Sequence, residues 1–530
     1  MAAAGDGAAA PVERRLSRRF QVSLVGEGAL VGLVGGAIVA LYRLTLASAE
    51  GLLRDVTGRA SGDPLLMAGW FALLALMALV VSALIRWEPA TSGSGIPQVD
   101  AEVLDRMDAP WARVIPAKFA EGSLLTLSGL SMGREGPSVQ LGGMSGKGVA
   151  RLLHRRRGEE RLLVTCGAAA GMSAAFHAPL TGVLFALEEI HKEFTAPLII
   201  SVMCSAVVSD FISSQVVGIE PVVSLVFVRD LPHADYALVV ALGVACGLIG
   251  ALHNRGMFAV QRLYERAFPR RPRLRLVVPF ILAGVAAFAW PELMCGGDAI
   301  VELLQEPVLP SVATLLALLL GKYAFTTLCF GSGAPGGTLF PLVVLGALVG
   351  ALFAAAGGAL GLPATYLPNF IALGVAGLFA GVVRAPVTAV VLVFELTGSL
   401  DALLAVSIVS VLAYVTSSLT STDAFYEHLL AALPGTAEHD SAVSGLEGTE
   451  KDLGTVRVGA GSRLEGVAVR DVPWPDGVRV LTVERAGSQI VPTGATRLMA
   501  GDELLFIVSA GALEDARLKL SLMCEPRVRP

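Results

Sequence analysis

Repeated apolar stretches of about twenty residues constrain the fold of this chain more than any other feature. Examples cover residues 22–41, 65–85, 198–217, 236–252 and 402–419. A helix needs about 20 apolar residues to cross the hydrocarbon core of a bilayer. Charged residues make up only 16% of the chain, against roughly 25% in soluble domains. The sequence therefore predicts an all-α polytopic membrane protein that has the lipid bilayer as a partner.

Many of the other apolar stretches are short or are interrupted by glycine and proline. Backbone that leaves the helical conformation inside a bilayer is tolerated only where protein buries it or where it lines a polar cavity. The broken helices therefore predict a transport pathway through the membrane region.

Arginine clusters indicate how the chain is oriented in the membrane. They comprise Arg14, Arg15, Arg18 and Arg19, then Arg155 to Arg157, then Arg270, Arg271, Arg273 and Arg275. The positive-inside rule assigns such clusters to the cytoplasm, so we expect a cytoplasmic N-terminus. The first apolar run is too long for a cleaved signal peptide and contains Glu27, so we interpret it as the first membrane helix. The six cysteines have no paired or metal-ligand spacing, and we assign them to packing.

The composition divides the chain into four parts. Residues 1–20 are rich in Ala, Gly and Arg and predict a cytoplasmic tail, and residues 21–430 form the membrane region. Residues 431–450 gain Ser, Gly and acidic residues, which is typical of a linker. In residues 451–530 the segments TVRVG, GVAVRDV, VRVLTVERAG and DELLFIVSA predict strands, and ALEDARLKLSL predicts a helix. We expect a small soluble α/β domain at the end of the chain.

The membrane region contains an internal repeat. HAPLTGVLFALEE at 177–189 aligns with RAPVTAVVLVFEL at 384–396 and matches Glu188 with Glu395. GREGP at 133–137 and GSGAP at 331–335 share Gly-x-x-x-Pro before a helical stretch. Transporters built from inverted repeats bind their substrate at the repeat interface, so we expect the site there.

Three segments combine glycine and proline at a break that opens a helix: SGSGIPQV at 92–99, GREGPSVQ at 133–140 and GSGAPGGTLFP at 331–341. The first turn of a helix has unpaired N–H groups and the positive end of the helix dipole, so it attracts anions. A single break of this kind is more often a packing kink. Three breaks in one membrane region, two of them related by the repeat, favour an anion pathway.

These motifs, together with FHAPLTGVLFALEE and FYEHLL, resemble the CLC family of chloride channels and proton-coupled chloride transporters over residues 21–430. The resemblance implies a homodimer in which each subunit is an inverted repeat of tilted and broken helices with its own anion pathway. It implies no cofactor, and chloride as the bound substrate. The implied chloride-binding residues are Ser94, Gly95, Ile96, Gly136, Thr338, Leu339, Phe340 and Tyr426. The family commonly has Phe at the place of Leu339, but a backbone amide there does not depend on the side chain.

Glu135 lies just inside a predicted helix N-terminus, where the dipole favours its charged form and where an anion also binds. The resemblance implies that Glu135 is the external gate and an obligatory proton carrier. Its neighbour Arg134 is interpreted as a structural residue that pairs and positions the turn.

Glu188 and Glu395 are interpreted as structural because each is the repeat counterpart of the other. Glu189 has no counterpart, since Leu396 stands at the matching place. Carboxylates within membrane segments are usually functional, and the resemblance implies that Glu189 is the internal proton-transfer residue. The alternative is a helix-end carboxylate paired with His191 or Lys192.

The C-terminal segments GSRLEGVAVRDV and TRLMAGDELLFIVSA resemble the TrkA-C half of the RCK regulatory module. The resemblance implies either the sensing of an unknown small ligand or a cap that stabilises a dimer.

The sequence thus predicts a proton-coupled chloride antiporter. Alternatives are a passive voltage- or pH-gated chloride channel, a fluoride/proton antiporter, which the serine of GSGIP disfavours, and a sensor with a vestigial membrane part. No zinc spacing, phosphate loop or nucleophile triad stands out, so the sequence predicts neither an enzyme, nor a metal site, nor nucleic-acid binding. We expect a prokaryotic inner membrane with both termini in the cytoplasm.

Overall fold

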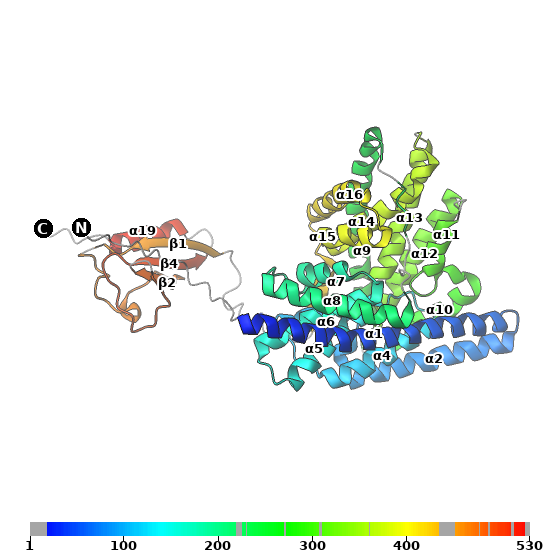
Figure 1. The fold of residues 1–530 in the computed structure, drawn as a ribbon, viewed down its shortest axis with the longest axis horizontal. Helices are drawn as coiled ribbons and strands as arrows, with labels where there is room; N and C mark the ends of the chain where they lie inside the picture. The colour runs from blue at the N-terminus through cyan, green and yellow to red at the C-terminus, as the bar shows by residue number, and fades with distance from the viewer. Residues whose placement is uncertain are drawn as a thin grey trace. The chain divides into compact units, whose positions relative to one another are not determined.

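The computed structural model describes two compact units, residues 1–436 and 437–530, which we treat separately (Figure 1). Within them it describes residues 18–218, 225–228, 231–269, 272–306, 310–359, 361–433, 451–459, 461–475, 477–485, 488–509 and 513–524. Most of the predicted tail at 1–20 and linker at 431–450 lies outside the described residues. Arg14, Arg15, Arg270 and Arg271 lie outside them as well.

The first half of the membrane unit has eight helices among the described residues. They are α1 (Arg18–Ala60), α2 (Pro64–Trp87), α3 (Ile96–Val103), α4 (Trp111–Leu127), α5 (Glu135–Leu152), α6 (Arg157–Phe176), α7 (Pro179–Phe185) and α8 (Ala196–Val217). A single wider turn, Ala186–His191, continues α7. In this half α1 packs on α8, and α5 packs on α6.

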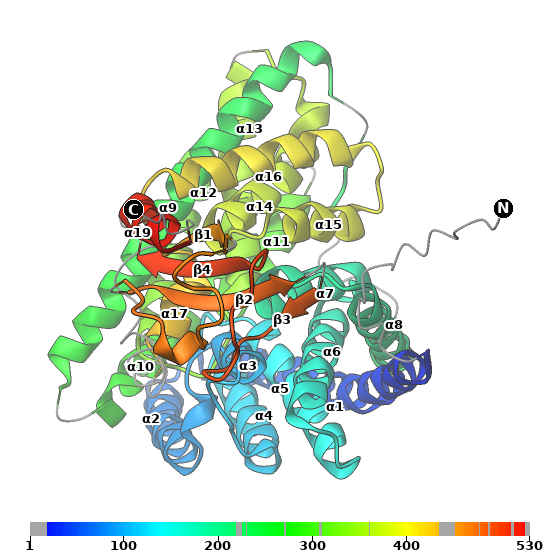
Figure 2. The same ribbon diagram turned by 90° about the vertical axis from the view of Figure 1, so that its left-hand side faces the viewer.

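The second half repeats this order of long and short helices. Its helices are α9 (Tyr236–Ala267), α10 (Val277–Ala289), α11 (Asp298–Gln305), α12 (Val312–Gly331), α13 (Leu339–Ala359), α14 (Leu367–Val383), α15 (Pro386–Thr397) and α16 (Ala402–Ser418), followed by α17 (Phe425–Ala431). The packing also repeats, because α9 lies on α16 and α13 lies on α14. Figure 2 shows the two halves side by side, with α1, α2, α4 and α6 on one side and α12, α13, α14 and α16 on the other.

A pair of backbone hydrogen bonds joins the two halves at equivalent positions. The N–H of Gly133 donates to the carbonyl of Gly337 at 2.7 Å, and the N–H of Gly337 donates to the carbonyl of Gly133 at 2.8 Å. Two residues later α5 begins at Glu135 and α13 begins at Leu339. The counterpart of GREGP is therefore GTLFP at 337–341. The alignment with GSGAP that the sequence predicted is wrong, because it matched Gly133 with Gly331, which is the last residue of α12.

The helices include long apolar ones that account for the predicted membrane region. Among the described residues, seven helices are long and apolar enough to cross a membrane. Each of the five apolar stretches that opened the sequence analysis lies within one of the helices, apart from the last residue of the 402–419 stretch. Of these seven helices, α13 and the span that contains α14 are the most enclosed, with 78% and 83% of their apolar windows buried. The N-terminal part of α13, from Leu339 to Ala351, is buried and therefore shielded from lipid.

The C-terminal unit contains a four-stranded antiparallel sheet in the order β1-β4-β2-β3. Its elements are β1 (Lys451–Arg457), β2 (Arg479–Arg485), β3 (Ser488–Ile490), β4 (Glu503–Ser509) and α19 (Leu513–Cys524). The strand predicted over GVAVRDV is wrong: Ala468 makes one isolated bridge to Arg497, and Val469–Asp471 forms a helical turn. The valine alternation there reflects loop residues that pack on the sheet, with Val472 in its core.

Candidate functional site

The predicted helix N-termini of α3, α5 and α13 meet inside the membrane unit. Gly95, which precedes α3, has a φ of 97° that favours glycine. A Cβ added at Gly136 would lie 2.6 Å from the Ser94 hydroxyl and 3.0 Å from the Cα of Gly337. Such close approach requires glycine at position 136, and it brings the unpaired N–H groups of three segments to one place. This arrangement suits a small anion.

Two hydroxyl groups face the same place. The side chains of Ser94 and Tyr426 are 2% and 1% exposed, and neither hydroxyl has a hydrogen-bond partner of ordinary geometry among the described residues. The Tyr426 phenol lies close to the hydroxyls of Ser94 and Thr338. Rings of Phe185 and Phe425 hold it, at centroid distances of 6.2 and 5.2 Å. Buried hydroxyls without a partner are rare, so both are available to donate to an anion.

The carboxylate of Glu135 lies at the start of α13, where the helix dipole attracts negative charge. The side chain is fully buried and lies close to the backbone N–H groups of Leu339 and Phe340. Neither oxygen has a hydrogen bond of ordinary geometry among the described residues. A side chain at Gly337 would collide with this carboxylate. The start of α13 can therefore hold either the carboxylate of Glu135 or another anion of similar size.

Arg134 lies at the start of α5 and contacts the second half of the repeat. Its guanidinium lies 5.3 Å from the centroid of the Phe340 ring, and its Nη2 is 3.9 Å from Asp298 Oδ1. A guanidinium over an aromatic ring is an attractive cation–π contact. Arg134 therefore ties the turn before Glu135 to α11 and α13.

Two buried lysines fix the loops before the short helices α3 and α11. Lys118 Nζ donates to the carbonyl oxygens of Thr91 at 2.8 Å and Gly93 at 2.7 Å. Lys322 Nζ donates to the carbonyl oxygens of Leu293 at 3.0 Å and Cys295 at 2.9 Å. The two lysines have the same spacing to Gly133 and Gly337 respectively, so they are repeat counterparts. The sequence analysis did not identify Lys322, which this shared spacing would have revealed.

Glu188 and Glu395 each accept hydrogen bonds from the half of the membrane unit to which they do not belong. The Glu395 carboxylate accepts hydrogen bonds from the N–H groups of Leu180 and Thr181 at the start of α7, at 2.8 and 2.7 Å. The Glu188 carboxylate accepts from the N–H groups at the start of α15, with Thr388 N–H at 2.7 Å. Each carboxylate thus satisfies orphan donors at the N-terminus of the equivalent helix in the other half.

Glu189 lies in the wider turn that continues α7, a type of turn that is frequent at functional sites. Its side chain is 7% exposed, and its Oε1 has no partner among the described residues. Of the cations proposed as alternative partners, Lys192 is near enough to Glu189 to interact electrostatically, but its Nζ pairs with Glu427 Oε1 at 3.4 Å, and His191 Nδ1 is 2.9 Å from Thr165 Oγ1. Glu189 is therefore a buried carboxylate without an ion pair among the described residues.

Asp100 on α3 is a buried carboxylate that the sequence analysis missed. Its side chain is 2% exposed, its Oδ1 has no partner among the described residues, and it lies close enough to Glu189 to interact electrostatically. The signal was available, because Asp100 is an acidic residue within a helix of the membrane region.

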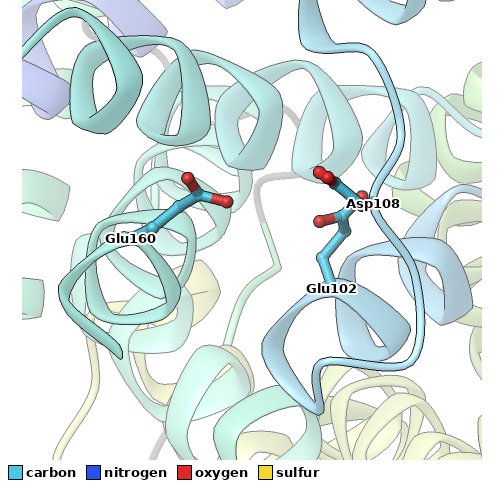
Figure 3. Close-up of side chains that lie close together, drawn as sticks. All are labelled: Glu102, Asp108 and Glu160. Carbon is cyan, nitrogen blue, oxygen red and sulfur yellow. The ribbon is translucent and has the colours of Figure 1, made fainter. Parts of the chain in front are cut away.

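Three further carboxylates, Glu102, Asp108 and Glu160, lie close together at the ends of α3 and α6 (Figure 3). Basic groups already neutralise them. Lys147 Nζ lies 2.7 Å from Glu102 Oε2 and 2.7 Å from Asp108 Oδ1, and Arg151 pairs with Asp108 and Glu160. Lys147 and Glu102 are both buried, and breaking such a pair leaves an uncompensated charge. The cluster is therefore an ion-pair network that fastens the C-terminal end of α3 to α5 and α6.

Comparison with known proteins gives two family matches. Residues 76–418 match the model of the voltage gated chloride channel family, and residues 453–521 match the TrkA-C domain. The chain is 32% identical over 419 residues to the H(+)/Cl(-) exchange transporter ClcA of Vibrio campbellii, covering 78% of this chain and 88% of the relative. It is 33% identical over 424 residues to the protein of the same name from Salmonella agona, with the same coverage.

Solved structures with the same fold include two antiporters. A slow cyanobacterial Cl−/H+ antiporter superposes with a TM-score of 0.73 at 26% identity, covering 79% of this chain and 99% of that one. A CLC-type fluoride/proton antiporter superposes with a TM-score of 0.64 at 21% identity, covering 76% and 97%, and supports the fold alone. The predicted membrane fold with a small C-terminal strand-containing domain is confirmed.

Proposed function

Because this chain belongs to the voltage gated chloride channel (CLC) family, we propose that it is a proton-coupled chloride antiporter. The relatives that carry the name H(+)/Cl(-) exchange transporter support this function. The observation that carries it in this chain is the position of Glu135, whose carboxylate lies at the start of α13 among the groups that suit an anion. A protonatable group and the transported anion then compete for one place.

We propose that chloride binds between the hydroxyls of Ser94 and Tyr426 and the backbone N–H groups at the helix starts. A hydroxyl donates one hydrogen bond without presenting a fixed charge, so it holds chloride without trapping it. The remaining positions contribute backbone, which explains why Leu339 is acceptable where an aromatic residue is common. The proposed chloride-binding residues are Ser94, Gly95, Ile96, Gly136, Thr338, Leu339, Phe340 and Tyr426.

Exchange follows from the competition between Glu135 and chloride. A charged Glu135 is attracted to the start of α13 by the helix dipole, and it excludes chloride. A protonated Glu135 loses this attraction, so chloride replaces it and the side chain carries its proton away. Chloride therefore enters the place of Glu135 only when Glu135 is protonated and carries its proton away. The movement of chloride in one direction is thereby coupled to the movement of a proton in the other.

We assign the inner end of the proton route to Glu189. The support is its burial, its unpartnered oxygen and its place near Asp100. A carboxylate is a group that can take up and release a proton, and this one is not tied to a cation by an ion pair among the described residues. Glu189 therefore exchanges protons with the cytoplasm by a path separate from that of chloride. Arg134, Glu188 and Glu395 hold the scaffold, and chloride is the only bound substrate that we assign, with no cofactor.

We further propose a homodimer in a prokaryotic inner membrane, with both termini in the cytoplasm and one anion pathway in each subunit. The relatives from Vibrio and Salmonella support the assignment to a prokaryotic membrane. Apolar side chains on the outer faces of α8 and α16, such as Phe211 and Leu404 at 60% and 58% exposed, offer surface for a partner subunit. We propose that the TrkA-C unit binds a small ligand or strengthens the dimer.

The test of exchange uses the purified full chain in liposomes loaded with chloride, with chloride and pH electrodes outside. A potassium ionophore with balanced potassium holds the membrane voltage at zero. We expect proton uptake that is driven by chloride efflux and survives the voltage clamp. Chloride efflux without proton uptake would identify a passive channel and refute the proposal.

A further inference from the structure

A cavity of about 230 Å³ lies between α9, α12, α13 and α14, and none of the proposed chloride-binding residues lines it. Leu252 of α9 and Leu320 of α12 form its mouth, with side chains 67% and 58% exposed. Leu345, Val349 and Leu378 form its deep wall and are at most 5% exposed. The cavity thus leads from the outer surface of the helix bundle into its interior.

The walls of this cavity are almost entirely apolar. No charged side chain lines it among the described residues, and its polar wall residues are His253 and Tyr323. The His253 Nδ1 lies 3.3 Å from Asn254 Oδ1, and the Tyr323 hydroxyl donates to the His253 carbonyl at 3.5 Å, so these two polar atoms are engaged by protein. A buried water needs two or more polar partners, and apolar cavities of this size stay dry and take apolar ligands. The walls therefore select hydrocarbon over ions and polar solutes.

The surroundings of the mouth identify the source of that hydrocarbon. Both α9 and α12 are long and apolar enough to cross a membrane. Leu252 and Leu320 lie near the midpoints of these helices, several turns from either end. Hydrocarbon chains of the bilayer occupy that depth. The cavity mouth is thus continuous with the lipid-facing surface.

We propose that this cavity is a binding site for the hydrocarbon chain of a bilayer lipid, which enters between Leu252 and Leu320. A flexible chain supplies dispersion contacts to wall atoms that otherwise lack neighbours on one side. The headgroup stays outside, and the absence of charged groups in the described lining means that chain shape, rather than headgroup, governs binding. The site goes beyond the transport function and does not depend on it.

The cavity also adjoins the anion site through aromatic packing. The His253 ring lies 5.5 Å from Tyr323 and 6.2 Å from Phe425 between centroids, and Phe425 directly precedes Tyr426 in α17. A chain in the cavity therefore supports the wall behind one of the proposed chloride donors.

The test uses the full chain in liposomes that contain a phosphatidylcholine with a photoactivatable diazirine near the end of one acyl chain. After illumination, peptide mass spectrometry locates the lipid adducts. We expect adducts on the deep wall, at Leu345, Val349 or Leu378, which a chain on the outer surface does not reach. Adducts confined to outward-facing residues such as Leu252 and Leu320 would overturn the proposal.

A matched pair of variants separates entry into the cavity from contact with its surface. Leu320→Trp fills the mouth, whereas Leu316→Trp places the same ring one turn earlier on the exposed face of α12, where Leu316 does not line the cavity. We expect Leu320→Trp to lower deep-wall labelling at least fivefold and Leu316→Trp to leave it unchanged. Equal labelling in the two variants would contradict entry at this mouth. Should Leu320→Trp fail to fold, the labelling pattern of the unaltered chain still decides the question.

Discussion

Replacing Glu135 with glutamine separates the two roles that the proposed mechanism gives this residue. Glutamine has nearly the same shape but carries neither a negative charge nor a transferable proton. The variant should abolish proton movement, because its side chain cannot take up and release a proton. It should retain some chloride flux, because the hydroxyls of Ser94 and Tyr426 and the helix starts are unchanged.

The same substitution should strengthen chloride binding, and the position of Glu135 in the structure indicates how large the increase in affinity should be. The Glu135 carboxylate is fully buried and lies near the N–H groups of Leu339 and Phe340 at the start of α13. A charge at a helix N-terminus in such a buried position is stabilised by up to about 2 kcal/mol. Chloride must overcome this competition in the unaltered chain. Removing it raises chloride affinity by up to about 30-fold, since about 1.4 kcal/mol corresponds to a factor of ten.

Two assays check the Glu135→Gln variant. Titration calorimetry of chloride into the chloride-free protein measures the affinity, and the liposome assay with chloride and pH electrodes measures the fluxes. Glu27→Gln is the control, because Glu27 on α1 pairs with Arg155 and lies outside the anion site. The control should keep both proton movement and affinity. Proton pumping by Glu135→Gln, or weaker chloride binding by the folded variant, would refute the competition between this carboxylate and chloride.

Three further predictions test the other assigned roles. Glu189→Gln should also stop proton movement but leave chloride affinity within about twofold, because Glu189 does not line the anion site; calorimetry that shows lost chloride binding would make Glu189 structural. Glu188→Gln and Glu395→Gln should each destabilise the protein by about 1–3 kcal/mol, because each removes a charged acceptor from the start of a helix; clearly unequal losses in thermal unfolding would contradict their equivalence. In the C-terminal unit, the Arg485 guanidinium, which donates to both oxygens of Asp502 at 2.8 Å, holds the pKa of Asp502 below its usual range. This ion pair stabilises the unit fully above the ordinary carboxyl pKa of about 3.9, and the stabilisation is lost as the pH falls through the lower pKa of the folded state. The protection factors of the β4 amides in the full chain, which compare each exchange rate with the intrinsic rate at the same pH, should therefore fall at acidic pH. The same pH profile of protection factors in Asp502→Asn would show that the pair contributes nothing.

Hydrophobic length predicted the membrane class from the sequence, because crossing a bilayer demands about 20 apolar residues whatever the topology. Glu188 and Glu395 are interpreted from the sequence only as structural, because they match within the repeat; the hydrogen bonds that each accepts at a helix start come from the structure. That each carboxylate contacts the helix start of the other half was not predictable, because it depends on how the halves pack.

The errors have a common physical origin in tertiary contacts. GSGAP resembles GREGP in letters, but backbone pairing between Gly133 and Gly337 decides the true register. GVAVRDV alternates like a strand, yet strand propensity reflects packing against neighbours, and this segment has one isolated bridge. Lys322 and Asp100 are omissions of another kind, because the sequence held a signal for each: the spacing to Gly337 that Lys322 shares with Lys118 and Gly133, and the acidic character of Asp100 within the membrane region.

Comparison of the two halves distinguishes the residues that hold the scaffold from those proposed to carry protons. Where the repeat counterparts share the same chemistry, as in Lys118 and Lys322 or Gly133 and Gly337, the residues form reciprocal or equivalent contacts that hold loops and helix starts. The two carboxylates proposed to move protons are the places where the symmetry breaks. The repeat counterpart of Glu135 is Leu339, and the repeat counterpart of Glu189 is Leu396. A two-fold scaffold presents the anion with equivalent helix starts from both halves, whereas proton movement needs an acid in only one of them. In the proposed mechanism, coupling therefore arises because asymmetric protonatable groups act on an anion site that both halves build.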